Sequence, residues 1–315
     1  MEKLNQSEDK LSDLMIQVYG SYKNGAIEES ASLLNEAHSI DYENKDVLTA
    51  LKCTSFWMDR FEKLDSQMEN FEKAEFLVKQ WIVFSGSFTK SFSIPFEDGL
   101  YSLKMGIFRT ALKFYSRVRE GDSDPEPEIL LRIGRCHKAL GDYDRAITSL
   151  EKALKRNSQS SPILAELADC YFMIDKIRNA KVFFREAFFI NPQLVDIDLL
   201  EADIIVKLVE EVKNRGYSGR ELKEWLPVYA VIFGVFNVKR ELRPIEYGKL
   251  KQTIYSLKNE LQESEEKRLL LPKLINHYFW LIDHYLCIDK DWETVEEILL
   301  NIKLLVFGLY EQYTN

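Results

Sequence analysis

Residues 141–157, GDYDRAITSLEKALKRN, begin with a glycine turn. Alanines and leucines at helical spacing follow, and the segment ends in basic residues. Ala146, Leu150 and Ala153 recur at i, i+4 and i+7, so they share one face of an amphipathic helix. A lone helix of this kind says little about function. A helix that is repeated along the chain defines an architecture.

The segment belongs to a pattern that recurs after about 34 residues, a spacing that marks a helix-turn-helix solenoid. When residues 127–160 are aligned with residues 161–194, each apolar position keeps its size class. The aligned pairs are Leu130 with Leu164, Ile133 with Leu167, Gly134 with Ala168, His137 with Tyr171, Ala146 with Ala180, Leu150 with Phe184 and Ala153 with Ala187. The sequence therefore predicts two similar helix pairs.

Small residues at fixed places indicate how the helices of each pair would pack. Gly134 and Ala168 have little or no side chain, so the second helix of the pair can approach closely. Ser161 followed by Pro162 is a favourable helix entry, because serine can cap and proline suits the first turn. Pro192 ends the second unit, because the residue before a proline disfavours the helical conformation.

The two units resemble the tetratricopeptide repeat family, and the second unit is the better match. The sequence departs from the family pattern at Leu130, His137 and Ser158, and Asp175 stands where the family has its turn glycine. The resemblance implies a right-handed solenoid of helical hairpins. It also implies that the first helix of each pair lines a concave surface.

Weaker copies of the pattern extend in both directions. Gly99 and Gly106 align with Gly134 and Gly141, which predicts a further helix pair with its turn at Gly106. A similar order of residues follows Gly25, and a helical face begins again near residue 199. Terminal repeats are commonly atypical, because one side meets solvent or another module.

The pattern changes from about residue 217. Ser218 and Glu221 form a capping-box signature, Pro227 would interrupt or bend the helix that follows, and Pro244 can open another. A last apolar stripe runs from Trp292 to residue 309. We predict an all-α fold in three regions. Degenerate N-terminal repeats occupy 1–90, and a solenoid core occupies 91–216, with its best units at 127–160 and 161–194. A C-terminal helical capping module occupies 217–315.

Composition supports a helical, globular protein. The 315 residues include 46% hydrophobic and 30% charged residues, and only 13 glycines and 8 prolines, too few for a turn-rich β-fold. A net charge of -9 disfavours broad binding of nucleic acid, which depends on clustered lysine and arginine. No leader segment is evident, and the most apolar run, 226–236, is too short to span a membrane. We expect a cytoplasmic protein without membrane insertion.

Cysteine and histidine are sparse and dispersed. Four cysteines without CxxC spacing predict reduced, buried thiols, and they are Cys53, Cys136, Cys170 and Cys287. His277, His284 and Cys287 form the best metal candidate, but a tetrahedral zinc needs further ligands. The sequence has no HExxH, no GxSxG and no glycine-rich phosphate loop. We therefore expect no metal, no cofactor and no enzymatic activity.

Two apolar segments have two interpretations. The aromatic residues 278–280 and the run 228–236 predict core packing, and the alternative is an exposed patch that marks a partner site. The stripe from Tyr247 to Leu261 favours intramolecular packing in the same way. A homo-oligomer formed through this stripe stays open as the alternative.

The resemblance directs attention to the non-core residues of the first helices. Arg132, Arg135 and Lys138 recur every three residues as a basic strip. The full predicted partner-binding set is Glu128, Leu131, Arg132, Arg135, Lys138, Ala165, Glu166, Asp169 and Phe172. Basic, acidic and apolar sectors together suit a peptide or helix, whereas the alternative is a solvated helix face. The lysine and asparagine clamp with which some family members hold a chaperone tail is missing.

These observations predict a non-enzymatic scaffold or adaptor that binds a protein or peptide partner in its concave groove and promotes assembly of a larger complex. The alternative is a regulatory protein that senses a peptide or small ligand and signals through its C-terminal helices. A helical enzyme would be a third class, and it would require ionisable residues that converge in a pocket.

Overall fold

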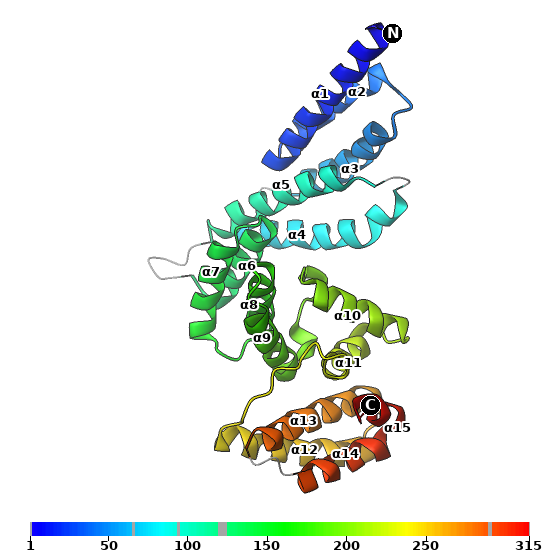
Figure 1. The fold of residues 1–315 in the computed structure, drawn as a ribbon. Helices are drawn as coiled ribbons and strands as arrows, with labels where there is room; N and C mark the ends of the chain where they lie inside the picture. The colour runs from blue at the N-terminus through cyan, green and yellow to red at the C-terminus, as the bar shows by residue number, and fades with distance from the viewer. Residues whose placement is uncertain (1, 65–66, 93–94, 119–124, 289–291, 315) are drawn as a thin grey trace. The chain divides into compact units, whose positions relative to one another are not determined.

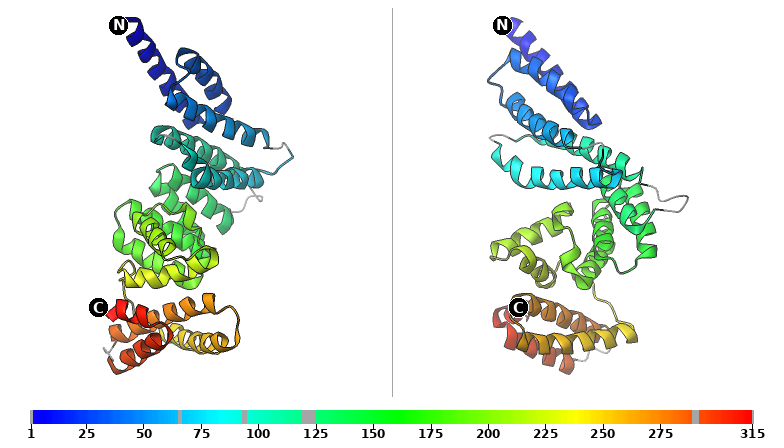
Figure 2. Two further views of the ribbon diagram at one scale, coloured as in Figure 1. Left: turned by 90° about the vertical axis from the view of Figure 1, so that its right-hand side faces the viewer. Right: turned by 180° about the vertical axis from the view of Figure 1, so that it is seen from behind.

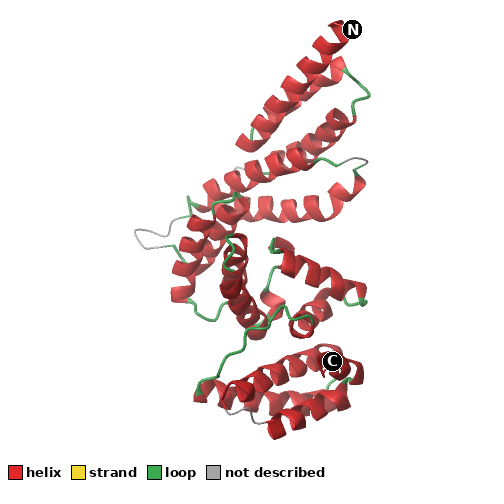
Figure 3. Cartoon of the chain, viewed as in Figure 1, coloured by secondary structure: helices red, strands yellow, loops and turns green. Residues whose placement is uncertain are grey.

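The computed structural model describes residues 2–64, 67–92, 95–118, 125–288 and 292–314. Over these residues the chain is made of helices and connecting loops without a β-strand (Figure 3), which confirms the predicted all-α class. The chain divides into two compact units, Met1–Ala153 and Leu154–Asn315. This division differs from the boundaries expected near residues 90 and 216, so the three-region organisation stays a prediction. Residues 1 and 315, the outer ends of two of those regions, lie outside the described residues.

The first unit is built from helices joined by short loops. They are α1 (Glu2–Asn24), α2 (Ile27–Ile40), α3 (Lys45–Glu62), α4 (Asn70–Val83), α5 (Glu97–Tyr115), α6 (Pro127–Ala139) and most of α7 (Tyr143–Arg156) (Figure 1). Aromatic side chains dominate the core, where Tyr22 and Trp57 are fully buried. The Tyr22 hydroxyl donates to the Ala50 carbonyl at 3.0 Å, so its polar atom is satisfied inside the core.

Residues 97–115 form one continuous helix, so the helix pair expected around Gly106 is wrong. Gly106 lies in the middle of α5, where a Cβ atom would come within 1.9 Å of the Tyr22 carbonyl oxygen on α1. The glycine therefore serves the close approach of two helix backbones, a use that its local sequence does not distinguish from a turn. Gly25, at the end of α1, does adopt a turn conformation, with φ of 74°.

The opening stretch has the predicted structure. Ala146, Leu150 and Ala153 are buried along α7, and Gly141 takes φ of 76° in the turn before that helix. A Cβ atom on Gly134 would lie 2.7 Å from Leu150, so the absence of a side chain on α6 lets α7 pack against it. The size pattern in the sequence thus corresponds to a real contact between the two helices.

The second unit begins with the better-matching repeat. Its helices are α8 (Ser161–Met173), α9 (Ile177–Ile190), the short 3-10 turns η3 (Pro192–Leu194) and η4 (Ile197–Leu199), α10 (Asp203–Asn214), α11 (Gly219–Ile232), α12 (Pro244–Glu263), α13 (Lys267–Ile288), α14 (Trp292–Leu305) and α15 (Phe307–Thr314). Ala180, Phe184 and Ala187 are buried on α9, at the places predicted from the alignment. Figure 2 shows α12 to α15, coloured yellow to red, as one bundle.

A buried ion pair joins α9 to that bundle. The Arg185 guanidinium donates to the Asp283 carboxylate on α13 and to the Val238 carbonyl, and it lies 4.7 Å from the Trp280 ring centre. Burial raises the pKa of Asp283, against the opposing effect of Arg185. These contacts fix α13 relative to α9.

Helix α11 runs through Pro227, so the predicted interruption is wrong, whereas a bend at this residue stays a prediction. Two further expectations for the C-terminal region need correction. The last apolar stripe is divided between α14 and α15, and Trp292 at its start is exposed. Cys287 is exposed, because it lies near the end of α13 beyond the packed part of that helix, whereas the other three cysteines are buried as predicted.

Candidate functional site

The predicted basic strip on α6 is mostly buried. Arg135 is 6% exposed and Lys138 is 3% exposed, and both are engaged with other groups of the protein. Because both side chains are buried, the expectation that they lie on an open surface is wrong. Their contacts agree with the rule that charged side chains are almost never fully buried unless they are paired. The same correction applies to Leu131, Ala165, Glu166 and Asp169, which are also buried. Some surface stays exposed at Glu128, Arg132 and Phe172. Their contact with a partner stays a prediction.

Arg132 belongs to an ion-pair network within the first unit. Its Nε atom lies 2.6 Å from Oε1 of Glu75 on α4, and its Nη2 atom lies 2.7 Å from Oε1 of Glu128 on α6. The Tyr115 hydroxyl on α5 donates to the same Glu75 oxygen at 2.5 Å. Burial and this carboxylate together raise the pKa of Tyr115. Glu75 therefore links α4, α5 and α6, and no local pattern could have paired Arg132 with a residue 57 positions away.

Asp169 on α8 has a structural role in the second unit. Its carboxylate accepts hydrogen bonds from the backbone N–H groups of Glu201 and Ala202 at 2.7 to 3.0 Å. Those residues precede the first turn of α10, where backbone donors lack partners within the helix. The acidic residue that we expected to face a partner instead anchors the start of the next helix.

The apolar and metal candidates also have structural explanations. Residues 278–280 are buried, as are Val228, Tyr229, Ala230 and Phe236, which confirms core packing for these parts of the two segments. His284 accepts a hydrogen bond from the Leu242 backbone N–H at 3.1 Å. Among the described residues, no three histidine, cysteine or carboxylate side chains form a group that could hold a metal ion.

A groove between α2 and α3 combines an apolar lining with several carboxylates. Two adjoining hollows of about 420 and 450 Å³ share Met58 and Glu62. We call them together the α2–α3 groove. Its apolar lining includes Ile27, Leu51, Met58 and Phe61, and its carboxylates are Glu28, Glu29, Asp59 and Glu62.

The α2–α3 groove has a negative charge balance. Among the described residues, no lysine or arginine lines either hollow. Asp59 is paired at the rim with Lys63 at 2.8 Å, and the hydrogen bond from Lys63 holds the pKa of Asp59 below its usual range. Glu28, Glu29 and Glu62 are exposed. Sequence reasoning missed this groove, because its residues come from two helices and follow no single helical stripe.

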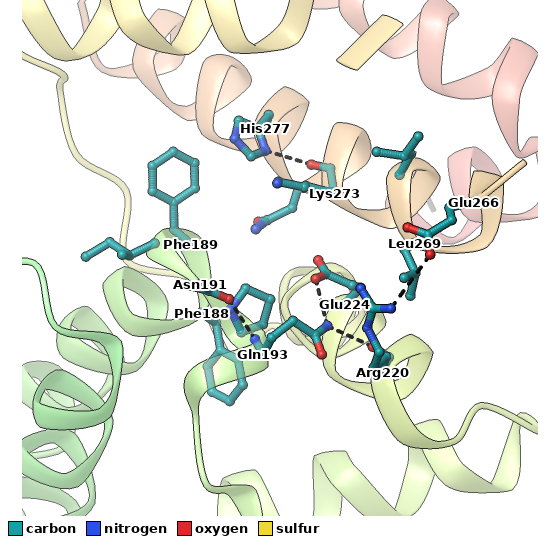
Figure 4. A pocket seen from close by; sticks show the side chains of 14 residues that line it. Phe188, Phe189, Asn191, Gln193, Arg220, Glu224, Glu266, Leu269, Lys273 and His277 are labelled. Atoms are coloured by element: carbon teal, nitrogen blue, oxygen red, sulfur yellow. Dashed lines mark hydrogen bonds and ion pairs between the residues drawn. The ribbon is translucent and has the colours of Figure 1, made fainter. Parts of the chain in front are cut away.

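Another hollow lies within the second unit, where the end of α9 meets α11 and α13 (Figure 4). It has a volume of about 290 Å³, and we call it the α11–α13 pocket. Its polar lining includes Gln193, Arg220, Glu224, Lys273, Asn276 and His277. The Gln193 amide donates to the Glu224 carboxylate at 2.7 Å and to the Arg220 carbonyl at 2.9 Å. These bonds hold one wall of the pocket in place.

Comparison with known proteins agrees with the repeat geometry. Residues 139–204 match the family model described as tetratricopeptide repeat, and the match covers α7, α8, α9 and the start of α10. No curated protein matches the chain. Within the part of the chain that the structure describes, no helix is both long and apolar enough to cross a membrane. The match, the repeated size pattern and the observed hairpins agree, so residues 139–204 are similar to the tetratricopeptide repeat family in sequence and in helical arrangement.

Proposed function

We propose that this protein is a non-enzymatic interaction module that binds a segment of a partner protein and recruits that partner into a larger assembly. The tetratricopeptide repeat match at residues 139–204 carries this proposal, because repeats of this family generally serve protein–protein interaction. Solenoid repeats suit the task, since each unit adds surface without needing a new core.

The α2–α3 groove supplies the chemistry of the partner. An apolar floor framed by Glu28, Glu29 and Glu62 suits a segment that presents leucine-like side chains on one face and lysine or arginine beside them. Such a segment would bury its apolar face on Met58 and Phe61 while its cations meet the carboxylates. A basic amphipathic helix fits this description.

The groove replaces the basic strip as the main proposed contact. Arg135 and Lys138 have too little exposed surface to receive a partner. Phe172, in the second unit, is proposed as a partner contact by itself. In the first unit, Glu128 and Arg132 are proposed as a second contact, where Arg132 would have to exchange part of its ion pair with Glu75 for the partner. That exchange makes the second contact weaker than the groove.

Affinity purification with matched variants tests the proposal. The bait is the full chain, as wild type or with Glu28→Lys and Glu62→Lys, and bound proteins are quantified by mass spectrometry. The control carries Asp13→Lys and Glu43→Lys, two exposed carboxylates outside the groove, so its net charge changes equally. We expect specific partners to bind the wild type and the control and to be lost from the groove variant. Retention of every partner by the groove variant would contradict the proposed surface.

A further inference from the structure

We propose that the α11–α13 pocket binds a free α-amino acid with an apolar side chain, held through both its ammonium and its carboxylate. This inference is independent of partner binding in the α2–α3 groove, because it rests on different residues in the other unit. The volume of about 290 Å³ lies just below the usual range for ligand pockets, which is about 300 to 1,000 Å³. A single amino acid is the right size, whereas a folded segment is not.

Asn276 is the first sign that the pocket takes a polar ligand. Its side chain lines the pocket and is 5% exposed, and it makes no hydrogen bond with any residue that the structure describes. The residue is largely buried, but its amide atoms are not among the fully buried polar atoms that lack a partner, so they stay accessible to a ligand in the pocket. The amide can donate to a carboxylate and accept from an ammonium.

His277 adds an acceptor to the same helix. Its Nδ1 atom donates to the Lys273 carbonyl at 2.7 Å, so in the neutral ring Nε2 is left as a hydrogen-bond acceptor. The ring packs 5.0 Å from Phe189, centre to centre. No other group among the described residues bonds to Nε2, which leaves it available to an N–H donor of a ligand.

Glu224 provides the negative charge that an ammonium needs. The side chain is 8% exposed, and Figure 4 shows it reaching from α11 toward the helix that carries Lys273 and His277. Burial raises the pKa of Glu224, with Gln193, Lys273 and Arg220 acting in the opposite direction. A buried carboxylate with an amide as its hydrogen-bond partner gains more from a cation than an exposed carboxylate would.

Lys273 provides the opposite charge. Its ammonium makes no ion pair or hydrogen bond with any described residue, although the residue lines the pocket. Arg220 is already 3.7 Å from Glu266, so Lys273 is the cation that is free to meet a ligand carboxylate. Lys273 is exposed, and its charge acts on Glu224, so the pocket places an exposed cation near a buried anion. Its apolar lining, formed by Phe189, Leu269 and Leu270, is left for the ligand's side chain.

Isothermal titration calorimetry on the full chain tests this proposal. The probes are L-leucine and L-phenylalanine, together with isopentylamine and 4-methylpentanoate, which are leucine without its carboxylate and leucine without its ammonium. We expect at least one amino acid to bind, and both single-charge analogues to bind at least tenfold more weakly than leucine. The proposal would be overturned if neither amino acid binds at 10 mM, or if an analogue binds as tightly as leucine. The concentration of 10 mM is about tenfold above a weak millimolar Kd, so even weak binding would be detected.

Substitutions locate the binding. Asn276→Ala and Glu224→Gln should each weaken amino-acid binding at least tenfold, whereas Glu263→Gln on the exposed face of α12 should leave it unchanged. Circular dichroism checks that each variant is folded. If Asn276→Ala does not fold, Glu224→Gln alone tests the site, because it keeps the shape and hydrogen-bonding capacity of the side chain. If Glu224→Gln binds the amino acid as tightly as the wild type, the ligand lies elsewhere and the assignment is wrong.

Discussion

At the residue scale, the turn positions show how one backbone requirement is met in two ways. Gly141 and Asp175 occupy equivalent places in the two repeat units, and both take positive φ, 76° and 60°. Glycine adopts this left-handed conformation without penalty, whereas a residue with a Cβ atom loses about 1 kcal/mol. Aspartate is among the side chains that tolerate it best. The sequence departure at Asp175 therefore preserves the turn at some energetic cost.

Replacing Asp175 with glycine should stabilise the protein. We expect Asp175→Gly to raise the free energy of unfolding by roughly 0.5 to 1 kcal/mol, because relief of the strained φ exceeds the added freedom of the unfolded chain. Gly141→Ala is the matched opposite and should lower it by about 1 kcal/mol, since no atom lies within 4 Å of the new Cβ and only φ is strained. Urea denaturation measures both. A destabilised Asp175→Gly protein would contradict this account of the turn.

His277 makes stability depend on pH. Burial lowers its pKa from 6.5 to about 4, against the opposing effect of the bond to the Lys273 carbonyl. As pH falls from 6.5 toward 4, the unfolded chain takes up a proton that the folded protein does not, so the free energy of unfolding decreases in this window. The loss attributable to His277 is about 2 kcal/mol at pH 5.

Comparison with His277→Gln isolates that dependence. Both proteins are unfolded in urea at pH 7.5 and pH 5, and the change between the two pH values should be about 2 kcal/mol more destabilising for the wild type. Buried carboxyls such as Glu224, with a raised pKa, act in the opposite direction in both proteins and cancel in the difference. Equal pH dependence in the two proteins would show that His277 titrates normally.

The sequence predicted residue roles well where they depend on near neighbours. Ala146, Leu150 and Ala153 are buried as their spacing indicated. The roles of Arg132 and Asp169 were missed, because their partners Glu75 and Glu201 lie 57 and 32 residues away. A charged residue looks the same in a sequence whether it faces solvent or a distant partner.

At the element scale, the crossing of α1 and α5 depends on a glycine. A Cβ on Gly106 would lie 1.9 Å from the Tyr22 carbonyl oxygen and 3.1 Å from the Gly25 nitrogen. Both neighbours are backbone atoms, so the helices themselves must separate to admit a methyl group. Gly106→Ala should therefore destabilise the protein by roughly 1 to 3 kcal/mol, the usual cost of overpacking.

Gly20 on α1 supplies the control for this prediction. It lies within the helix, and no atom lies within 4 Å of a Cβ built on it. Gly20→Ala should stabilise the protein by up to about 1 kcal/mol through helix propensity alone. Thermal unfolding followed by circular dichroism compares the two variants. If both alanines change the midpoint in the same direction, close packing at Gly106 does not limit the crossing.

Helix starts at proline were predictable, whereas the predicted caps were wrong, because neither Ser161 nor Ser218 makes a side-chain cap hydrogen bond. Pro127, Pro162 and Pro244 each fall in the first turn of a helix, and Gly141 lies in a turn, as local chemistry requires. Gly106 misled the alignment, because a glycine that admits another backbone and a glycine that makes a turn have the same local signature. The contact of α1 with α5 joins segments about 80 residues apart and leaves no periodic trace.

At the scale of the whole molecule, the repeat accounts for part of the chain only. The family match ends at residue 204, and the helices of the C-terminal bundle follow no 34-residue period. The α2–α3 groove lies outside the two best-matching repeat units, and the α11–α13 pocket lies at their edge. A sequence repeat predicts how successive helices are arranged. Surfaces formed by several helices can be identified only from the three-dimensional structure.

The proposed function depends on binding of a basic amphipathic segment in the α2–α3 groove. Fluorescence anisotropy of a labelled helical peptide with leucine on one face and lysine on its flanks tests it directly, beside the same peptide with glutamate in place of lysine. We predict that the lysine peptide binds and that Glu28→Lys with Glu62→Lys weakens it at least tenfold, while Asp13→Lys with Glu43→Lys does not. Equal binding of the two peptides, or an unchanged Kd in the groove variant, would contradict the proposal.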